Sequence, residues 1–188
     1  MKSWKLLTLL ALSLPAFATL SPVEHVSAPG GKLVYYILSD ENKKGTEDYE
    51  GGEQISSRNL TTGEEAVLLH AKPNSNPKDT LYGFSNLKLS QDSKTLYFET
   101  AAWATSSAIH SLDIATRKTS YITSGALVCV VSGGEYQGGL IIQQHRYFVQ
   151  GGSYDSLYLF DPKGKEIGLV AGENVTREQV LLMCQSLG

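Results

Sequence analysis

Short apolar stretches alternate with polar turns along most of the chain. The stretches 33–38, 96–100 and 140–144 are strongly apolar and too short for helices. Each is followed, after a polar loop, by two further short stretches that flank a turn. Runs of this kind, bounded by Gly, Asn, Asp or Pro, are typical of β-strands. The remaining predicted strands are 55–60, 65–70, 85–89, 108–114, 119–123, 127–131, 156–160 and 166–170.

The last part of the chain has a different period. Val175, Gln179 and Leu182 recur at helical spacing, and Asn174 stands at the position of an N-cap. This spacing is typical of a helix with one face turned toward a core. We therefore predict a helix over 175–187 and β structure elsewhere.

The strand pattern occurs three times. In each copy a serine (Ser27, Ser90 or Ser132) precedes a turn, an apolar strand, a loop and a hairpin. A self-similar unit of roughly 40 to 50 residues is typical of the four-stranded blades of a β-propeller. Because propellers typically have four to eight blades, three units are too few for ordinary closure. We expect an all-β fold of three four-stranded, propeller-like blades in an open arc or a compact stack, with the C-terminal helix over an exposed end. The predicted units are 27–71, 84–124 and 126–171.

The hairpin turns carry Asn59, Asp113 and Asp161 at equivalent places. Asn and Asp tolerate the backbone conformations of tight turns and hydrogen-bond to their own backbone. We therefore interpret these three residues as turn formers rather than as catalytic groups.

The first residues have the composition of a secretory signal peptide. Lys2 and Lys5 precede the apolar stretch 6–14, and an Ala-x-Ala pattern suited to a signal peptidase ends at Ala18. The apolar stretch is well short of the roughly 20 residues that cross a bilayer as a helix. We expect cleavage near Ala18, a periplasmic or secreted location, and a single domain over 19–188. No later segment is predicted to span a membrane.

The charge balance argues against a nucleic-acid partner. The chain has 16 Lys and Arg residues against 19 Asp and Glu residues, and removal of the predicted signal would take away two of the basic ones. Nucleic-acid binding needs clustered Lys and Arg side chains that neutralise phosphates. This composition therefore favours a different class of partner.

Two cysteines, Cys129 and Cys184, are present. In an oxidising compartment they could form a disulfide bond that closes a loop of about 55 residues and stabilises the fold by about 4 kcal/mol. The alternative is a pair of buried, unreactive thiols. The sequence leaves both possibilities open.

The second unit resembles the repeat of TolB-type β-propellers. That repeat reads Ser-Pro-Asp-Gly-Lys, followed by an apolar strand and a hairpin that contains Asp. Here the sequence SQDSK at 90–94 precedes the strand, Asp113 lies in the following hairpin, and Gln91 and Ser93 stand in place of Pro and Gly. The resemblance implies a propeller fold and, as in TolB-like propellers, a scaffold role in the cell envelope.

The loop between the second and third strands of each unit is expected to lie on one common face. These loops are 39–52, 101–107 and 145–153. Aromatic and Arg side chains are enriched in binding hot spots, and the acidic residues of the first loop would steer a basic partner. The candidate partner-binding residues are Asp48, Tyr49, Trp103, His145, Arg146, Tyr147 and Tyr154.

A structural role is the alternative for part of this set. Trp103, Tyr147 and Phe148 could instead cap the ends of the blades as ordinary core residues. Burial of these side chains would remove them from any contact surface.

The chain shows little sign of catalytic or metal chemistry. Its histidines are scattered, without His-x-x-x-His or Cys-x-x-Cys spacing, so neither a metal site nor a cofactor is predicted. A carboxylate pair such as Asp48 and Glu50 could do acid–base work in principle. We expect a protein that is not an enzyme.

Three functions remain as hypotheses. The stretch 89–92, with 106–108 and Asp113, resembles a segment of small periplasmic immunity proteins that neutralise cell-wall amidases delivered by type VI secretion. That resemblance implies an exported inhibitor whose partner is a secreted peptidoglycan hydrolase, with the loops that contain Trp103 and His145 entering its cleft. The alternatives are an envelope scaffold of TolB-like type and a small-ligand or sugar binder that uses Trp103 and tyrosines for stacking.

Overall fold

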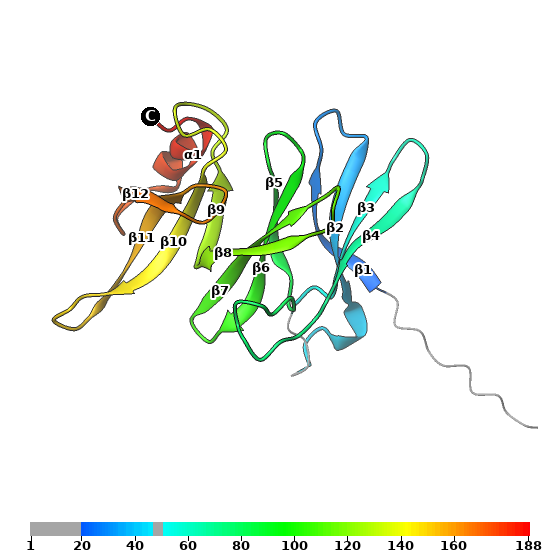
Figure 1. The fold of residues 1–188 in the computed structure, drawn as a ribbon, viewed down its shortest axis with the longest axis horizontal. Coiled ribbons are helices and arrows are strands. Elements are labelled where there is room, and N and C mark those ends of the chain that lie inside the picture. Colours follow the sequence, from blue (N-terminus) through cyan, green and yellow to red (C-terminus); the bar gives the residue numbers. More distant parts are fainter. Residues whose placement is uncertain (1–19, 47–50) are drawn as a thin grey trace, which may run out of the picture.

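The strands form three four-stranded antiparallel sheets, with one α-helix at the C-terminus, in a computed structural model that describes residues 20–46 and 51–188 (Figure 1). Within each sheet, consecutive strands are neighbours. This arrangement confirms the predicted fold class of propeller-like blades with a C-terminal helix.

The three blades have the following strands. Blade 1 consists of β1 (Leu20–Ser27), β2 (Leu33–Asp40), β3 (Gln54–Asn59) and β4 (Glu65–His70). Blade 2 consists of β5 (Ser85–Leu89), β6 (Thr95–Trp103), β7 (Ser106–Asp113) and β8 (Thr119–Ser124). Blade 3 consists of β9 (Ala126–Val130), β10 (Leu140–Tyr147), β11 (Ser153–Phe160) and β12 (Glu166–Ala171). The short helix η1 (Glu41–Lys43) follows β2, and α1 (Arg177–Gln185) follows blade 3.

The first sheet begins at Leu20, not at Ser27 as predicted: the strand β1, which pairs with β2, was not predicted from the sequence. The segment Leu20–Ser27 alternates only weakly and contains Pro22, beside which the pairing with β2 is irregular. Proline is tolerated at such irregularities because it cannot donate a ladder hydrogen bond. The predicted signal peptide, 1–18, lies outside the described residues.

Equivalent turns use equivalent hydrogen bonds. The side chain of Asn59 accepts from the backbone N–H of Thr61, and the side chain of Asp161 accepts from that of Lys163. Asp113 accepts from both the backbone and the hydroxyl of Thr116, which lowers the pKa of this carboxyl. These contacts confirm the interpretation of the three residues as turn formers.

Two apolar cores lie between adjacent blades, and the first strands of the blades lie next to one another, β1 against β5 and β5 against β9. Between blades 1 and 2 the fully buried side chains include Tyr35, Ile37, Ile55, Phe84 and Phe98. Between blades 2 and 3 they include Ile109, Leu140 and Ile142. The strand periodicity places these residues on the faces that meet, except for Phe84, which directly precedes β5 and pairs with Gly52 in an isolated bridge.

A buried carboxylate also links blades 2 and 3. Glu99 is 7% exposed, and its Oε1 accepts hydrogen bonds from the side-chain amide of Asn86 and from the backbone N–H of Leu127. Asn86 has a φ of 52° at a pairing irregularity in β5, and its amide also donates to the carbonyl of Leu127. A satisfied buried polar group of this kind specifies how two blades dock.

The C-terminal helix covers the outer side of blade 3. Val180, Met183 and Cys184 pack against a cluster that contains Ile141 and Leu159. Cys184 forms a disulfide bond with Cys129 of β9, with 6.0 Å between the Cα atoms. The bond therefore joins the helix covalently to the blade that it covers.

The helix is shorter than predicted, and its cap is a different residue. Thr176, rather than Asn174, is the N-cap, because its hydroxyl accepts from the N–H of Gln179 while the Gln179 side chain accepts from the N–H of Thr176. This reciprocal capping box satisfies two backbone donors, which a cap at Asn174 would leave open. Leu182, predicted on the apolar face, is 59% exposed.

Candidate functional site

Three connections lie on one side of the molecule, along the lower part of Figure 1: the η1 segment after β2, the β6–β7 turn and the β10–β11 turn. The β3–β4 turn lies on the opposite side. This is the arrangement that the blade pattern predicts. Asp48 and Tyr49, two of the candidate partner-binding residues, lie outside the described residues.

A bulge in β6 directs the side chain of Trp103. Thr100 pairs with Ala108 and Trp103 pairs with Ser106, so two residues of β6 lie opposite one residue of β7. One extra residue reverses the side toward which the following side chains point. Trp103 is 38% exposed and lines a cavity rather than packing as a fully buried cap.

The cavity has a volume of about 330 Å³ and lies where the β6–β7 turn approaches blade 3. Gly125 forms part of its lining, and a Cβ atom there would lie 2.5 Å from the carbonyl oxygen of Gln143. Glycine is therefore required for this close approach of the two segments. The polar side chains of the lining are Thr105, Ser106, Ser107, Gln143, His145 and Asp155.

His145 and Asp155 form a cross-strand pair at one side of the cavity. They lie opposite each other on β10 and β11, with 3.0 Å between Nδ1 of His145 and Oδ1 of Asp155. The ring of Tyr147 meets the imidazole edge-on, with 4.9 Å between the ring centres. These two contacts hold the imidazole in a defined orientation.

The candidate residues of β10 are divided between the two sides of the sheet. The pairing of β10 with β11 is regular throughout, so side chains alternate along the strand. His145 and Tyr147 therefore share the side of Gln143, whereas Arg146 points to the other side with its cross-strand partner, Tyr154. The predicted set is thus brought together only in part: Trp103, His145 and Tyr147 adjoin the cavity region, and Arg146 and Tyr154 do not.

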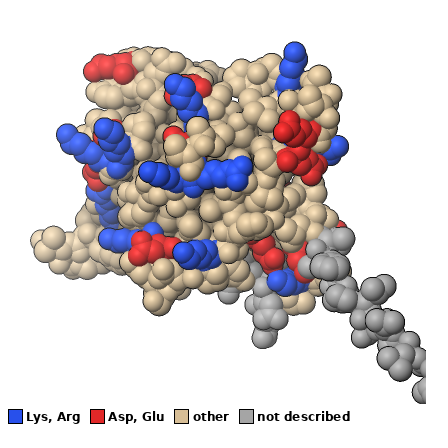
Figure 2. Space-filling model, turned by 45° about the vertical axis from the view of Figure 1, so that its right-hand side comes forward, with Lys and Arg blue, Asp and Glu red and all other residues tan. Residues whose placement is uncertain are grey.

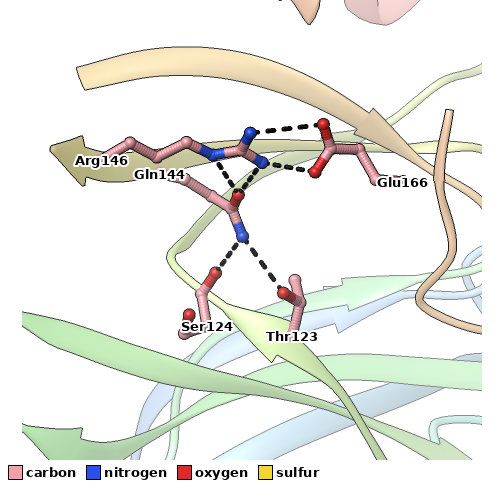
Figure 3. Close-up of polar contacts among 5 residues, drawn as sticks. All are labelled: Thr123, Ser124, Gln144, Arg146 and Glu166. Atoms are coloured by element: carbon pink, nitrogen blue, oxygen red, sulfur yellow. Dashed lines mark hydrogen bonds and ion pairs between the residues drawn. The ribbon is translucent and has the colours of Figure 1, made fainter. Parts of the chain in front are cut away.

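Arg146 is held by contacts within the fold (Figure 3). Its guanidinium donates hydrogen bonds to Gln144 and Glu166 and lies 3.5 Å from the ring centre of Tyr158. Burial alone would lower the pKa of Arg146, but the hydrogen bond and the negative charge of Glu166 raise it. The ion pair of Arg146 with Glu166 therefore links β10 to the outer strand β12.

Gln144 continues this network toward blade 2. Its side-chain amide donates to the hydroxyl of Thr123 and to the backbone carbonyl of Ser124 (Figure 3). The base of the β10–β11 hairpin is therefore tied to both neighbouring elements, so the hairpin leaves the body of the protein in a fixed direction.

The tip of the β10–β11 hairpin is an exposed apolar projection. Tyr147, Phe148 and Val149 are 72%, 57% and 106% exposed. Figure 1 shows the hairpin extending beyond the body, and the corresponding projection at the lower left of Figure 2 shows no Lys, Arg, Asp or Glu. The tip is also ordered internally: the Phe148 ring lies 4.5 Å from that of Tyr154, and the Phe148 N–H donates to the carbonyl of Gly152.

Sequence reasoning missed several residues of this region. Gln143 could have been found, because it lies two positions before His145 on the same strand and must therefore share its side. Val149 could have been found as part of an apolar run in a loop. Asp155 and Ser107 could not, because their positions depend on the strand register and on the bulge in β6.

Comparison with known proteins shows similarity at the level of fold. No protein-family model matches the sequence, and no curated protein matches it. The β-propeller domain of the Trilobed protease from Pyrococcus furiosus, which has an open velcro topology, aligns with a TM-score of 0.53 and 14% identity over 80% of this chain and 44% of that one. A prolyl endopeptidase structure aligns with a TM-score of 0.52 and 16% identity over 84% of this chain and 23% of that one.

A third structure, TolB from Acinetobacter baumannii, aligns over 78% of this chain and 42% of that one, at 12% identity and a TM-score of 0.39. The aligned part of this chain therefore spans less than half the length of each of these three structures. The first two alignments establish a propeller-like fold.

Two further observations concern the described residues, 20–46 and 51–188. They contain no group of three or more His, Cys, Asp or Glu side chains arranged to hold a metal ion. Among the helices of this part of the chain, none has the length and apolar character needed to cross a bilayer.

Proposed function

We propose that this chain is a protein-binding module without enzymatic activity and that the tip of the β10–β11 hairpin is its main contact. The observation that carries the proposal is the exposure of Tyr147, Phe148 and Val149 at the end of a projection. Exposed apolar side chains gathered at one place are typical of interaction sites. Aromatic residues in particular supply much of the binding free energy of protein interfaces.

The shape of the hairpin favours a concave partner. A narrow projection buries most of its surface only when it enters a cleft, and the tip has no charged side chain that would lose solvation there. The network of Arg146, Gln144 and Glu166 fixes the hairpin base before binding. Such preorganisation lowers the entropy cost of association.

More specifically, we propose an exported immunity or inhibitor protein that occupies the cleft of a secreted cell-wall hydrolase. The signal-like sequence at 1–18 supports export to the periplasm, and the resemblance of 89–92 and 106–108 to immunity proteins supports this class of partner. An envelope scaffold of TolB-like type is the alternative, supported by the repeat at 90–94.

A set of matched variants tests the contact. The test variant replaces Tyr147, Phe148 and Val149 by Ser. The control is Leu60→Ser, because Leu60 is 54% exposed in the β3–β4 turn on the opposite side. Each protein is used to capture partners from a periplasmic extract, and a protein retained by the parent chain is purified for calorimetric titration. We expect the triple variant to bind it about 100-fold or more weakly and the control to bind normally.

The identity of the partner then separates the specific hypotheses. Inhibition of a captured peptidoglycan hydrolase by the parent chain, and its loss in the triple variant, supports the immunity role. A captured envelope subunit supports the scaffold role instead. Equal capture by the parent chain and the triple variant contradicts the hairpin assignment, provided that circular dichroism shows both to be folded.

A further inference from the structure

We propose that the cavity beside Trp103 is a binding site for a neutral saccharide of one or two rings. This site goes beyond the proposed protein contact, because Phe148 and Val149 of the hairpin tip lie outside the cavity lining, although Tyr147 contacts His145 at its edge. The cavity combines one aromatic side chain with a ring of hydroxyl, amide and carboxylate groups. The side chains that line the cavity and the volume of the cavity each limit which ligands it can bind.

The volume indicates a small ligand. At about 330 Å³ the cavity lies at the lower end of the range of roughly 300 to 1,000 Å³ that is usual for small-molecule sites. A ligand of one or two rings fits this space. Only a short part of an extended polymer would fit in the cavity, and the rest would lie along the surface of the protein.

The charges of the lining disfavour an ionic ligand. Among the described residues that line the cavity, none is Lys or Arg, so a phosphate or carboxylate would find no permanently charged partner, and Nδ1 of His145 already faces Asp155. The one carboxylate, Asp155, already faces His145 at 3.0 Å. Arg146 is directed away, to the other side of β10. The ligand is therefore expected to be neutral.

The polar groups fit a ligand that carries many hydroxyls. Gln143 offers both a donor and an acceptor, the hydroxyls of Thr105 and Ser107 can do either, and Asp155 accepts. A hydroxyl of a sugar is at once donor and acceptor, so it can satisfy groups of both kinds. A purely apolar ligand would leave these groups unpaired at a cost in affinity.

Trp103 supplies the apolar part of the contact. A sugar ring has one face of C–H groups, which packs against an aromatic ring, and its hydroxyls lie around the edge of that face. The bulge in β6 turns Trp103 toward the cavity, and bulges are enriched beside functional sites, where they redirect a side chain. The indole and the polar groups of β10 and β11 therefore surround one space.

Fluorescence of Trp103 gives a direct test. The chain has two tryptophans, and Trp4 lies in the predicted signal peptide, so either cleavage near Ala18 or Trp4→Phe in the full chain leaves Trp103 as the sole indole. This protein is titrated with glucose, galactose, N-acetylglucosamine, maltose and chitobiose, and with adenosine and inorganic phosphate for comparison. We expect a saturable change with at least one sugar and none with phosphate.

Substitutions in the same background locate the site. Gln143→Ala should weaken the sugar response about five- to tenfold, because it removes one hydrogen-bonding side chain. Asp155→Asn should weaken it by a similar factor. Gln91→Ala is the matched control, because Gln91 is an exposed residue of the β5–β6 turn, away from the cavity, and should leave the response unchanged.

The proposal is overturned by any of three results: no response to any of the five sugars, a response to adenosine alone, or a sugar response that Gln143→Ala and Asp155→Asn leave unaltered. Phe148 and Val149 lie outside the lining of the cavity, so the substitutions Phe148→Ser and Val149→Ser should not affect sugar binding. Failure of the saccharide site and failure of the protein contact are therefore distinguishable.

Discussion

Acidification should destabilise this fold through one buried histidine, His110 of β7. Its side chain lies between Phe98 and Tyr121, with ring centres 5.7 Å and 5.8 Å away. His110 is 2% exposed, and its Nε2 has no hydrogen-bond partner within the described part of the chain. Burial lowers the pKa of His110 to about 4, although the negative charge of Asp79 opposes this effect.

The direction of the pH dependence follows from the two pKa values. The unfolded chain takes up a proton at His110 near the ordinary pKa of 6.5, whereas the folded chain does so only near 4. Above pH 6.5 the residue is neutral in both states and has no effect on stability. As the pH falls from 6.5 to 4 the unfolded state is favoured progressively, by about 2 kcal/mol at pH 5 and by about 3 kcal/mol below pH 4.

Urea unfolding at pH 7.5 and pH 5 measures this effect. The perturbation is His110→Phe, which removes the titrating group and keeps an aromatic ring beside Phe98. We expect the parent protein to lose about 2 kcal/mol more than this variant between the two pH values. His70→Phe is the matched control, because His70 is exposed at the end of β4 and should leave the pH dependence unchanged. Parallel losses in the parent and His110→Phe proteins, or an NMR titration of His110 near pH 6.5, would refute the reasoning.

Two further predictions concern stability. Replacing both Cys129 and Cys184 by Ser should lower the free energy of unfolding by about 4 kcal/mol in the chain-entropy model, because the bond closes a loop of 55 residues; denaturation with urea under oxidising conditions measures this, and an unchanged midpoint would contradict it. Glu99→Ala should cost about 2 kcal/mol, because the backbone N–H of Leu127 and the amide of Asn86 lose their buried acceptor. Thermal unfolding followed by circular dichroism tests the second prediction, and a melting temperature within error of that of the parent protein would contradict it.

Much of the fold could be predicted because its signals are local. The alternation of apolar and polar residues acts along a single strand, and the turn residues Asn59, Asp113 and Asp161 bond to backbone groups a few positions away. Three copies of one such unit are enough to indicate blades. The weaker pattern of β1 was missed, because its strand character depends on pairing with β2.

The candidate site was predictable only as a region. The loop positions follow from blade topology, and that placed Trp103 and His145 on the same side of the molecule. Which side chains point into the cavity depends on the bulge in β6 and on the register of β10 with β11. Arg146 is adjacent to His145 in the sequence and yet belongs to a different network.

The sequence by itself determined the turns, the number of blades and every strand except β1, because these depend on interactions within a few residues. The tertiary structure alone decided the contacts between segments: Asn86 with Glu99 and Leu127 across two blades, and His145 with Asp155 beside the cavity. Such contacts depend on desolvation and on cross-strand register. Neither can be read from a single segment of the sequence. Chemistry that requires side chains from several strands therefore becomes visible only when the sheets are assembled.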